Sequence, residues 1–435
     1  GTTKSAPSTS NAFSVNVNLG VSSTKTVDIY GNIKSGSNAG SWISNIDATA
    51  TGSVTGSTVD ADAVDLQTIT LSTAVLTVAN NTGSTPDSTN VIAGSAEVKV
   101  GSFRFTAQYS PYTVQEIKVK VPANAATSVT AVTLKWAGGS ATQALTLSSG
   151  ALQTHATSTF TGLTFNVPEN TDADLDVYVG IPTIASGASS GAAISAILDF
   201  NEGFKAVDSS GTSDTSLAAA DLTSVSTGKG TMHVRKSIPT LSAVALDTTN
   251  LAAGSDQVLG RVKVTANAAG DIGWKKLAFT VNKTAAITLG ATTTIALFNS
   301  ANTQITGTFA TTTGAQLNQA QAFTVLATTG ILVFEATSEQ QISAGSSVTY
   351  ELRGTVGGIA SGANSVSVSV AAPSTSATTV AYATIHTEVG DTGESFVWSD
   401  RSSITTVHSE TTLDWTHDYL VKTLPLTVGN RSVNF

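Results

Sequence analysis

Two groups of aspartates have a spacing that could bind calcium. They are Asp60, Asp62 and Asp65 in the first group, and Asp172, Asp174 and Asp176 in the second. Calcium takes six to eight oxygen ligands, and carboxylates often supply several of them. Neither group has EF-hand spacing or a turn glycine, and we favour a solvated acidic strand or loop as the explanation of each group. We therefore predict that the protein has no cofactor, with calcium at these aspartates as the alternative.

Other residues offer little for catalysis. Gly187–Gly191 reads G-x-S-x-G, but a nucleophile elbow needs a strand-to-helix turn in an α/β sheet, and this stretch is a Ser/Gly-rich loop. Four residues of metal-ligating type lie close together near the C-terminus: His408, Glu410, Asp414 and His417. They could hold zinc, and the alternative that we favour is a polar segment packed on the preceding domain. We predict that the protein is not an enzyme.

Candidate sites for sugars are sequons and tryptophans. Asn80, Asn282 and Asn430 each begin an N-x-S/T sequence, which can carry a glycan in a secreted protein. Trp274 is followed by two lysines in an expected turn, so it is the best candidate for an exposed ring that stacks on a sugar. A position in the core of a sandwich is the alternative for each tryptophan.

Composition and charge exclude several classes of protein. The 435 residues carry a net charge of −9 and no strong basic cluster, which excludes a nucleic-acid binder. No run of 18 apolar residues could form a transmembrane segment, and the absence of cysteine excludes a disulfide scaffold. The few charges and the many Ser and Thr residues are typical of extracellular β-proteins. The first residue is Gly, so we predict an extracellular or cell-surface location after removal of an N-terminal segment.

Strands must position all of these residues. Apolar and polar residues alternate along Phe13–Leu19, Glu116–Val121 and Ser365–Val370, which predicts half-buried antiparallel strands. Turn-forming clusters recur about every ten residues, and helical periodicity is nearly absent. We predict an all-β fold of tandem Ig-like antiparallel β-sandwiches.

An internal repeat defines the predicted domains. Residues 91–121 match residues 251–281, and later segments continue the match at an offset of about 170 residues. The N-terminal residues match only the second half of this repeat, because residues 13–17 correspond to 163–167 and 332–336. The predicted organisation is a partial sandwich at 1–65, repeat units at 66–237 and 238–403, and a tail with a candidate donor strand at 404–435.

Half a sandwich leaves a strand edge and an apolar face open, and another subunit could complete it by strand addition. The tail is a candidate donor, although it could equally fold back on its own domain. A head-to-tail contact of this kind does not close, so it would build a homopolymer. The predicted interface residues are Phe13, Val15, Val17, Leu19, Val27, Ile29, Leu424, Leu426, Val428, Val433 and Phe435.

Several segments carry a resemblance to a known group of proteins. Phe396–Asp400, with Asp414–Thr416 and the repeated pattern at Val98–Ala107 and Val258–Ala266, resembles Ser/Thr-rich secreted bacterial surface proteins with tandem Ig-like sandwiches, as in candidate-phylum bacteria. The resemblance implies fibre or surface-layer material, and therefore a structural subunit that binds itself. The alternative is a monomeric cell-surface adhesin or glycan-binding module, for which the cell envelope or glycans would be the partners.

Overall fold

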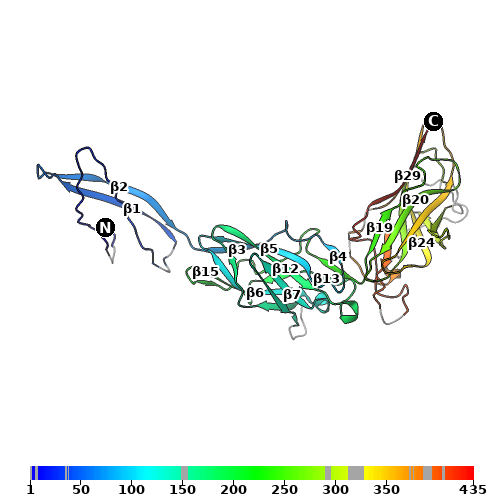
Figure 1. Cartoon of the computed structure of the whole chain (residues 1–435), viewed down its shortest axis with the longest axis horizontal. Coiled ribbons are helices and arrows are strands. Elements are labelled where there is room, and N and C mark those ends of the chain that lie inside the picture. The colour runs from blue at the N-terminus through cyan, green and yellow to red at the C-terminus, as the bar shows by residue number, and fades with distance from the viewer. Residues whose placement is uncertain are drawn as a thin grey trace. The chain divides into compact units, whose positions relative to one another are not determined.

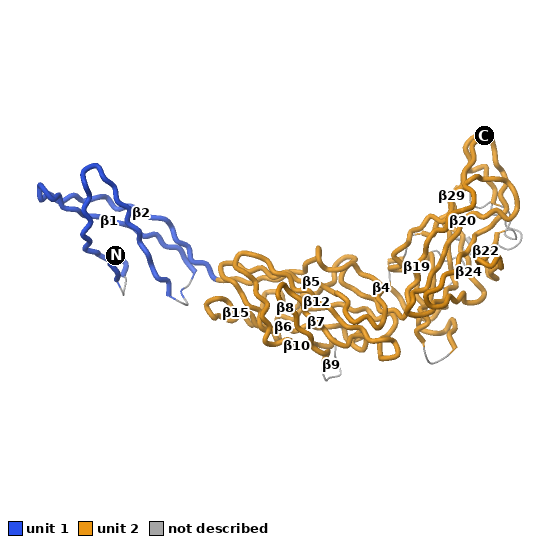
Figure 2. The backbone as a smooth tube through the Cα atoms, in the orientation of Figure 1, with its two compact units in different colours: residues 1–73 blue, residues 74–435 orange. Residues whose placement is uncertain are grey.

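The computed structural model describes residues 2–4, 8–34, 37, 39–147, 155–289, 295–311, 328–371, 374–375, 377–385, 394–403 and 407–435. The predicted all-β class is confirmed, since the described residues form strands joined by short turns and very little helix. The chain divides into two compact units, residues 1–73 and residues 74–435 (Figure 2). No helix among the described residues is long and apolar enough to cross a membrane.

The first unit contains a single β-hairpin. Strand β1 (Gly40–Thr51) pairs antiparallel with β2 (Thr58–Leu71), and no other strand extends this sheet within the described part of the chain (Figure 1). The hairpin continues six residues beyond the predicted boundary at residue 65. Its sheet therefore has two unpaired edges, one along each strand.

The second unit begins with a β-sandwich. One of its sheets has the order β3-β5-β12-β7-β8. The facing sheet is organised around β6 (Tyr112–Pro122), which pairs with β10, β11, β14 and β15. A third sheet has the order β13-β18-β4, with β18 and β4 parallel.

The bounds of the remaining elements in this sandwich are β3 (Val75–Asn80), β4 (Thr89–Ile92), β5 (Val98–Gln108), η1 (Ala123–Ser128), β7 (Ala131–Trp136), β8 (Gly139–Ala144), β9 (Thr146–Leu147), β10 (His155–Phe160), β11 (Phe165–Val167), β12 (Thr171–Gly180), η2 (Ile184–Ser186), β13 (Ala193–Ile194), β14 (Ile197–Asp199), β15 (Lys205–Asp208), β16 (Ser213–Asp214), β17 (Asp221–Thr223) and β18 (Met232–Arg235).

A second β-sandwich follows in the same unit and repeats this plan. One sheet has the order β19-β20-β25-β22, and the other has the order β23-β24-β21-β26-β29, with β27 also paired to β21. The bounds are β19 (Pro239–Ala243), β20 (Gly254–Ala266), β21 (Ile272–Lys283), β22 (Ala296–Asn299), β23 (Gly307–Thr311), β24 (Thr329–Ile342), β25 (Ser347–Val356), β26 (Ala363–Val370), α1 (Tyr382–Ile385), β27 (Phe396–Ser399), β28 (Trp415–Thr416) and β29 (Leu426–Asn434).

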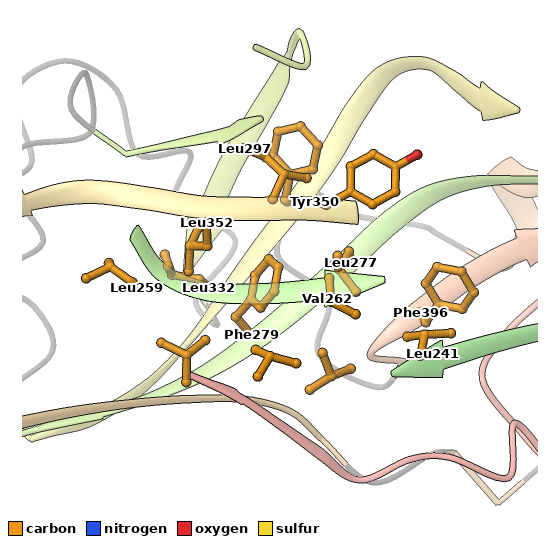
Figure 3. Close-up of a cluster of buried hydrophobic side chains, with 14 of the residues drawn as sticks. Leu241, Leu259, Val262, Leu277, Phe279, Leu297, Leu332, Tyr350, Leu352 and Phe396 are labelled. Atoms are coloured by element: carbon orange, nitrogen blue, oxygen red, sulfur yellow. The ribbon is translucent and has the colours of Figure 1, made fainter. Parts of the chain in front are cut away.

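Each sandwich has its own hydrophobic core. In the second sandwich, inward side chains from both sheets meet, with Val262 and Leu352 from one sheet and Leu277, Phe279 and Leu332 from the other (Figure 3). Alternation explains this arrangement, because every second residue of a strand faces the same side. The first core is formed in the same way, by side chains of β5 and β12 that pack against side chains of β6.

The tail differs from the prediction of a donor strand for a next subunit. Strand β29 pairs antiparallel with β26 of the same chain, from Ala363↔Asn434 to Val370↔Leu426. Val428 is buried in the second core, and Gly429 lies directly against β20. The alternative of a tail that folds back on its own domain is therefore what the structure shows, because the alternating residues complete that domain's core.

Candidate functional site

The first half of the N-terminal unit has the alternating apolar and polar residues of β-strands, but these residues do not pair with any strand. No described residue from Asn11 to Lys34 belongs to a strand. Phe13, Val15, Val17 and Leu19 are between 46% and 65% exposed. Val27 and Ile29, the next apolar residues of the predicted interface, are exposed as well. This segment thus presents apolar side chains and unpaired backbone groups at the same place.

The hairpin adds a second exposed apolar surface. Trp42 lies opposite Ile69, and Ile46 lies opposite Val64, so these four side chains share one face of the β1–β2 sheet. Trp42, Ile69 and Val64 are each about half exposed. Sequence reasoning missed this face, although apolar residues alternate with aspartates along residues 59–63 and again along residues 64–66.

The opposite face of the hairpin carries Asp60 and Asp65 of the first acidic group, together with the exposed Ile43. Asp60 accepts a hydrogen bond from Thr49 Oγ1 at 3.1 Å, and Asp65 accepts one from Asn45 Nδ2 at 2.8 Å. Asp62 is exposed on the same strand. No cluster of three or more His, Cys, Asp or Glu side chains that could hold a metal ion occurs in the described part of the chain.

The second acidic group faces a row of polar partners on β5. Asp172 accepts a hydrogen bond from Thr106, and Asp174 forms an ion pair with Arg104. Asp176 forms an ion pair with Lys99 at 2.8 Å. These carboxylates alternate with core residues along β12, which is the arrangement of a solvated strand face stabilised by cross-strand pairs.

The three sequons lie in different settings. Asn80 uses its side-chain nitrogen to donate hydrogen bonds to the carbonyl oxygens of Thr223 and Ser224, at 3.1 Å and 3.0 Å. The nitrogen that a glycan would modify is thus engaged. Asn282 and Asn430 are exposed on β21 and β29.

The residues predicted for other chemistry are structural. Trp274 is fully buried on β21, where its ring packs edge-on against Tyr350 at 4.9 Å. The prediction of an exposed sugar-binding ring was wrong, because Trp274 lies within β21 and its side chain faces the core. In the G-x-S-x-G stretch, Ser190 donates a hydrogen bond to buried Asp400.

A buried charged network, which sequence reasoning missed, joins the two sandwiches of the second unit. The guanidinium of Arg235 donates hydrogen bonds to Asn90 in the first sandwich and to Thr379 and Thr416 in the second. Asp400 is fully buried and accepts hydrogen bonds from Ser190 and from the backbone of Lys236. Burial raises the pKa of Asp400, while the charge of Arg235 opposes that rise.

A second buried cluster surrounds His408. Its Nε2 lies 3.0 Å from Asp414 Oδ1, and its Nδ1 lies 2.9 Å from Glu339 Oε2. Arg401 forms an ion pair with the same Glu339. Burial alone would lower the pKa of His408, but the hydrogen bonds to Asp414 and Glu339 outweigh it and raise this pKa to about 9. The cluster therefore holds a charged imidazolium and stabilises the loops around β28.

The His408 cluster predicts that stability depends on alkaline pH. A raised folded-state pKa stabilises the fold fully below the unfolded value of 6.5, and this contribution is lost as the pH rises through about 9. We expect the difference in free energy of unfolding between the natural protein and a His408→Gln variant to shrink by about 3 kcal/mol between pH 6 and pH 10. Urea unfolding at both pH values measures this difference. A difference in free energy of unfolding that is the same at pH 6 and at pH 10 would contradict the prediction.

Comparisons with known proteins give no family. No protein-family model matches the chain, and no curated protein matches it. Among solved structures, the C-terminal domain of the Streptococcus agalactiae antigen I/II polypeptide BspA matches at 9% identity, over 68% of this chain and 95% of that chain, with a TM-score of 0.19. The C-terminal domain of the Streptococcus pyogenes antigen I/II-family protein AspA matches at 10% identity, over 68% and 94%, with a TM-score of 0.19.

The B domain of a biofilm associated protein is also similar, at 9% identity over 67% of this chain and 80% of that chain, with a TM-score of 0.20. By their names, these are domains of streptococcal antigen I/II proteins and of a biofilm associated protein. At such identities and TM-scores, however, the similarity assigns no function to this chain. Its candidate site is defined instead by the exposed segment Asn11–Lys34 and the β1–β2 hairpin.

Proposed function

We propose that the chain is a structural subunit of an extracellular filament or surface layer, and that it joins its neighbours by β-strand complementation at the N-terminal unit. The observation that carries this proposal is the exposed alternating row at Phe13–Leu19, in a segment that no strand pairs. Open backbone groups next to an apolar row form a template for another chain.

The energetics favour such a contact. Burying three or four of these side chains would contribute roughly 1.5–3 kcal/mol each, before the cost of ordering the segment. Because a contact between two different surfaces does not close on itself, it propagates into a filament or sheet. The low content of charged residues, 12%, keeps repulsion between stacked copies small. The same composition supports an extracellular location.

The structure changes which strand can be the donor. Leu424, Leu426 and Val428 pack in their own sandwich, and Val433 lies beside them on β29. Phe435 is 76% exposed at the end of this strand. Donation of the tail in trans would require β29 to leave β26. The accepting surface of the proposal therefore lies at the N-terminal unit, and β29 could become its donor only by leaving β26.

Electron microscopy of the full-length chain tests this proposal with a matched pair of variants. Val15→Asp/Val17→Asp/Leu19→Asp puts three charges on the apolar row, and Ser14→Asp/Asn16→Asp/Asn18→Asp puts the same charges on the opposite side of the same segment. We expect filaments or sheets from the natural protein and from the second variant, and none from the first, because only the first charges the row that must be buried.

Both variants change exposed residues outside the 74–435 unit, so that unit's unfolding transition serves as a check on folding. Single particles of the natural protein at every concentration tested would overturn the filament proposal. Equal loss of assembly in both variants would show that the added charge alone, and not strand pairing, controls assembly.

A further inference from the structure

We propose that Asn282 and Asn430 carry N-linked sugars on one outer face of the second sandwich, and that the sugar on Asn430 shields an open strand edge. The inference goes beyond the proposed function, because it concerns another face of the molecule and does not depend on filament formation. The two acceptor sequences are Asn282-Lys-Thr284 and Asn430-Arg-Ser432.

Both sequons lie on strands that turn the acceptor residue to solvent. Neighbouring residues of a strand face opposite sides, so the first and third residues of each sequon share one face. The middle residues, Lys283 and Arg431, are buried, while Asn282 and Asn430 are exposed. Each acceptor amide therefore projects away from the core of the sandwich.

The register of the sheet brings the two sequons together. Asn282 of β21 lies opposite Ser367 of β26, and Ser367 lies opposite Asn430 of β29. Because adjacent strands are about 4.8 Å apart, the two asparagines lie roughly 10 Å apart on the same face. The pairing of three strands thus makes one surface from two sequons that are far apart in the sequence.

The amide nitrogen that bears the sugar is available at both positions. Within the described part of the chain, the side chain of Asn282 bonds only through Oδ1, which accepts a hydrogen bond from Thr329 Oγ1 at 2.8 Å. No described residue forms a hydrogen bond with the side chain of Asn430. The modification leaves the bond to Thr329 intact, because the sugar is attached to Nδ2.

The reaction is a glycosyl transfer from a sugar that is linked to a lipid pyrophosphate. A bond forms between the asparagine Nδ2 and the anomeric carbon of the sugar. The bond from that carbon to the phosphate oxygen breaks, so the lipid pyrophosphate leaves with the bonding electrons. The amide nitrogen releases one proton to solvent and keeps the other.

The third sequon provides an internal control. The Nδ2 of Asn80 donates hydrogen bonds to the carbonyl oxygens of Thr223 and Ser224, and its Oδ1 accepts one from Thr85. A sugar would leave Nδ2 with a single hydrogen, so at least one of the two bonds to carbonyl oxygens would be lost. We therefore expect Asn80 to be unmodified in the folded protein.

The place of Asn430 in its sheet gives its sugar a role. Strand β29 is the outermost strand, and no described strand pairs with its far edge. Ser432 uses its backbone on that edge to bond with Thr249 and Leu251. The backbone groups of Asn430, two residues earlier, point to the same edge. The exposed side chains of β29 here are uncharged, so a bulky sugar is what keeps another chain from adding to this edge.

Mass spectrometry of the full chain, purified from the cells that make it, tests the modification. The chain is digested, and the masses of the peptides that contain the three sequons are measured. We expect a sugar mass at Asn282 and at Asn430, and none at Asn80. An unmodified Asn282 or Asn430 would overturn the inference. Equal occupancy of Asn80 would also overturn it, because the three-residue motif alone would then determine modification.

Two variants of Ser432 test the role of the sugar. Ser432→Ala removes the sequon and leaves Asn430 in place, while Ser432→Thr keeps the sequon. The side chain of Ser432 is exposed, and its bonds to Thr249 and Leu251 use backbone atoms, so neither substitution disturbs the fold. Both are made in the variant with three aspartates in the N-terminal apolar row, so that the N-terminal contact does not contribute.

We expect Ser432→Ala to lose the sugar mass at Asn430 and to keep the sugar mass at Asn282. By light scattering, we expect it to form larger particles at concentrations at which Ser432→Thr stays dispersed. Particles of equal size from the two variants would overturn the shielding role. A sugar retained at Asn430 in Ser432→Ala would overturn the assignment of this sequon as the acceptor.

Discussion

Replacing Arg235 with leucine is expected to destabilise the 74–435 unit by about 3–5 kcal/mol, because it breaks the buried hydrogen bonds of the guanidinium and removes the charge that favours the ionised form of buried Asp400. Both side chains are almost inaccessible to water. The guanidinium also connects the two sandwiches through Asn90, Thr379 and Thr416, so we expect their unfolding to separate into two transitions. Calorimetry and urea unfolding measure both effects.

Two further variants isolate the buried charge. Arg235→Leu/Asp400→Asn removes both charges, and we expect it to recover part of the lost stability. Arg104→Leu applies the same substitution to the exposed ion pair with Asp174, and we expect little change there. Equal effects of Arg235→Leu and Arg104→Leu would contradict the assigned role of the network.

Alternation along the sequence predicted strands well where their partners are present. Glu116–Val121 and Ser365–Val370 lie within β6 and β26, with the apolar residues buried as expected. Phe13–Leu19 has the same alternation and is in no strand. Alternation indicates which face of a strand will be buried but not which strand will pair with it, and a ladder needs both.

The choice of partner also explains the other differences. The tail was recognised as strand-forming, but its pairing with β26 depends on contacts across more than fifty residues of sequence. Trp274 seemed exposed because two lysines follow it. The structure buries Lys276 as well and pairs it with Glu394 at 3.2 Å, so a charged neighbour did not indicate a turn.

The Arg235 network lay beyond sequence reasoning for the same reason. Arg235 ends a short apolar strand, which could suggest a special role for a lone charge. Its partners Thr379 and Thr416, however, are ordinary residues of a different sandwich. Their convergence follows from how the two sandwiches pack and not from any local pattern.

The position of β29 leads to the second large prediction, which concerns Gly429. A Cβ atom at this position would lie 2.0 Å from the carbonyl oxygen of Leu259 and 2.8 Å from the Cα of Gly260, so alanine cannot fit unless β29 moves away from β20. We expect Gly429→Ala to lower the free energy of unfolding by about 3 kcal/mol or more, because a backbone atom cannot rotate aside as a side chain can. Urea unfolding followed by tryptophan fluorescence measures this loss.

The matched control for Gly429→Ala is Gly83→Ala, where the new Cβ would meet only Asn81 Oδ1 at an ordinary 3.5 Å. We expect the control to unfold like the natural protein, and we expect the amides of β26 to exchange faster in Gly429→Ala alone, because β29 protects them. Unchanged exchange in β26 would show that β29 tolerates the added atom. A released β29 is also the donor strand that the sequence predicted for the open N-terminal unit, so filaments formed by Gly429→Ala but not by the natural protein would show that this donor becomes available only when β29 leaves β26.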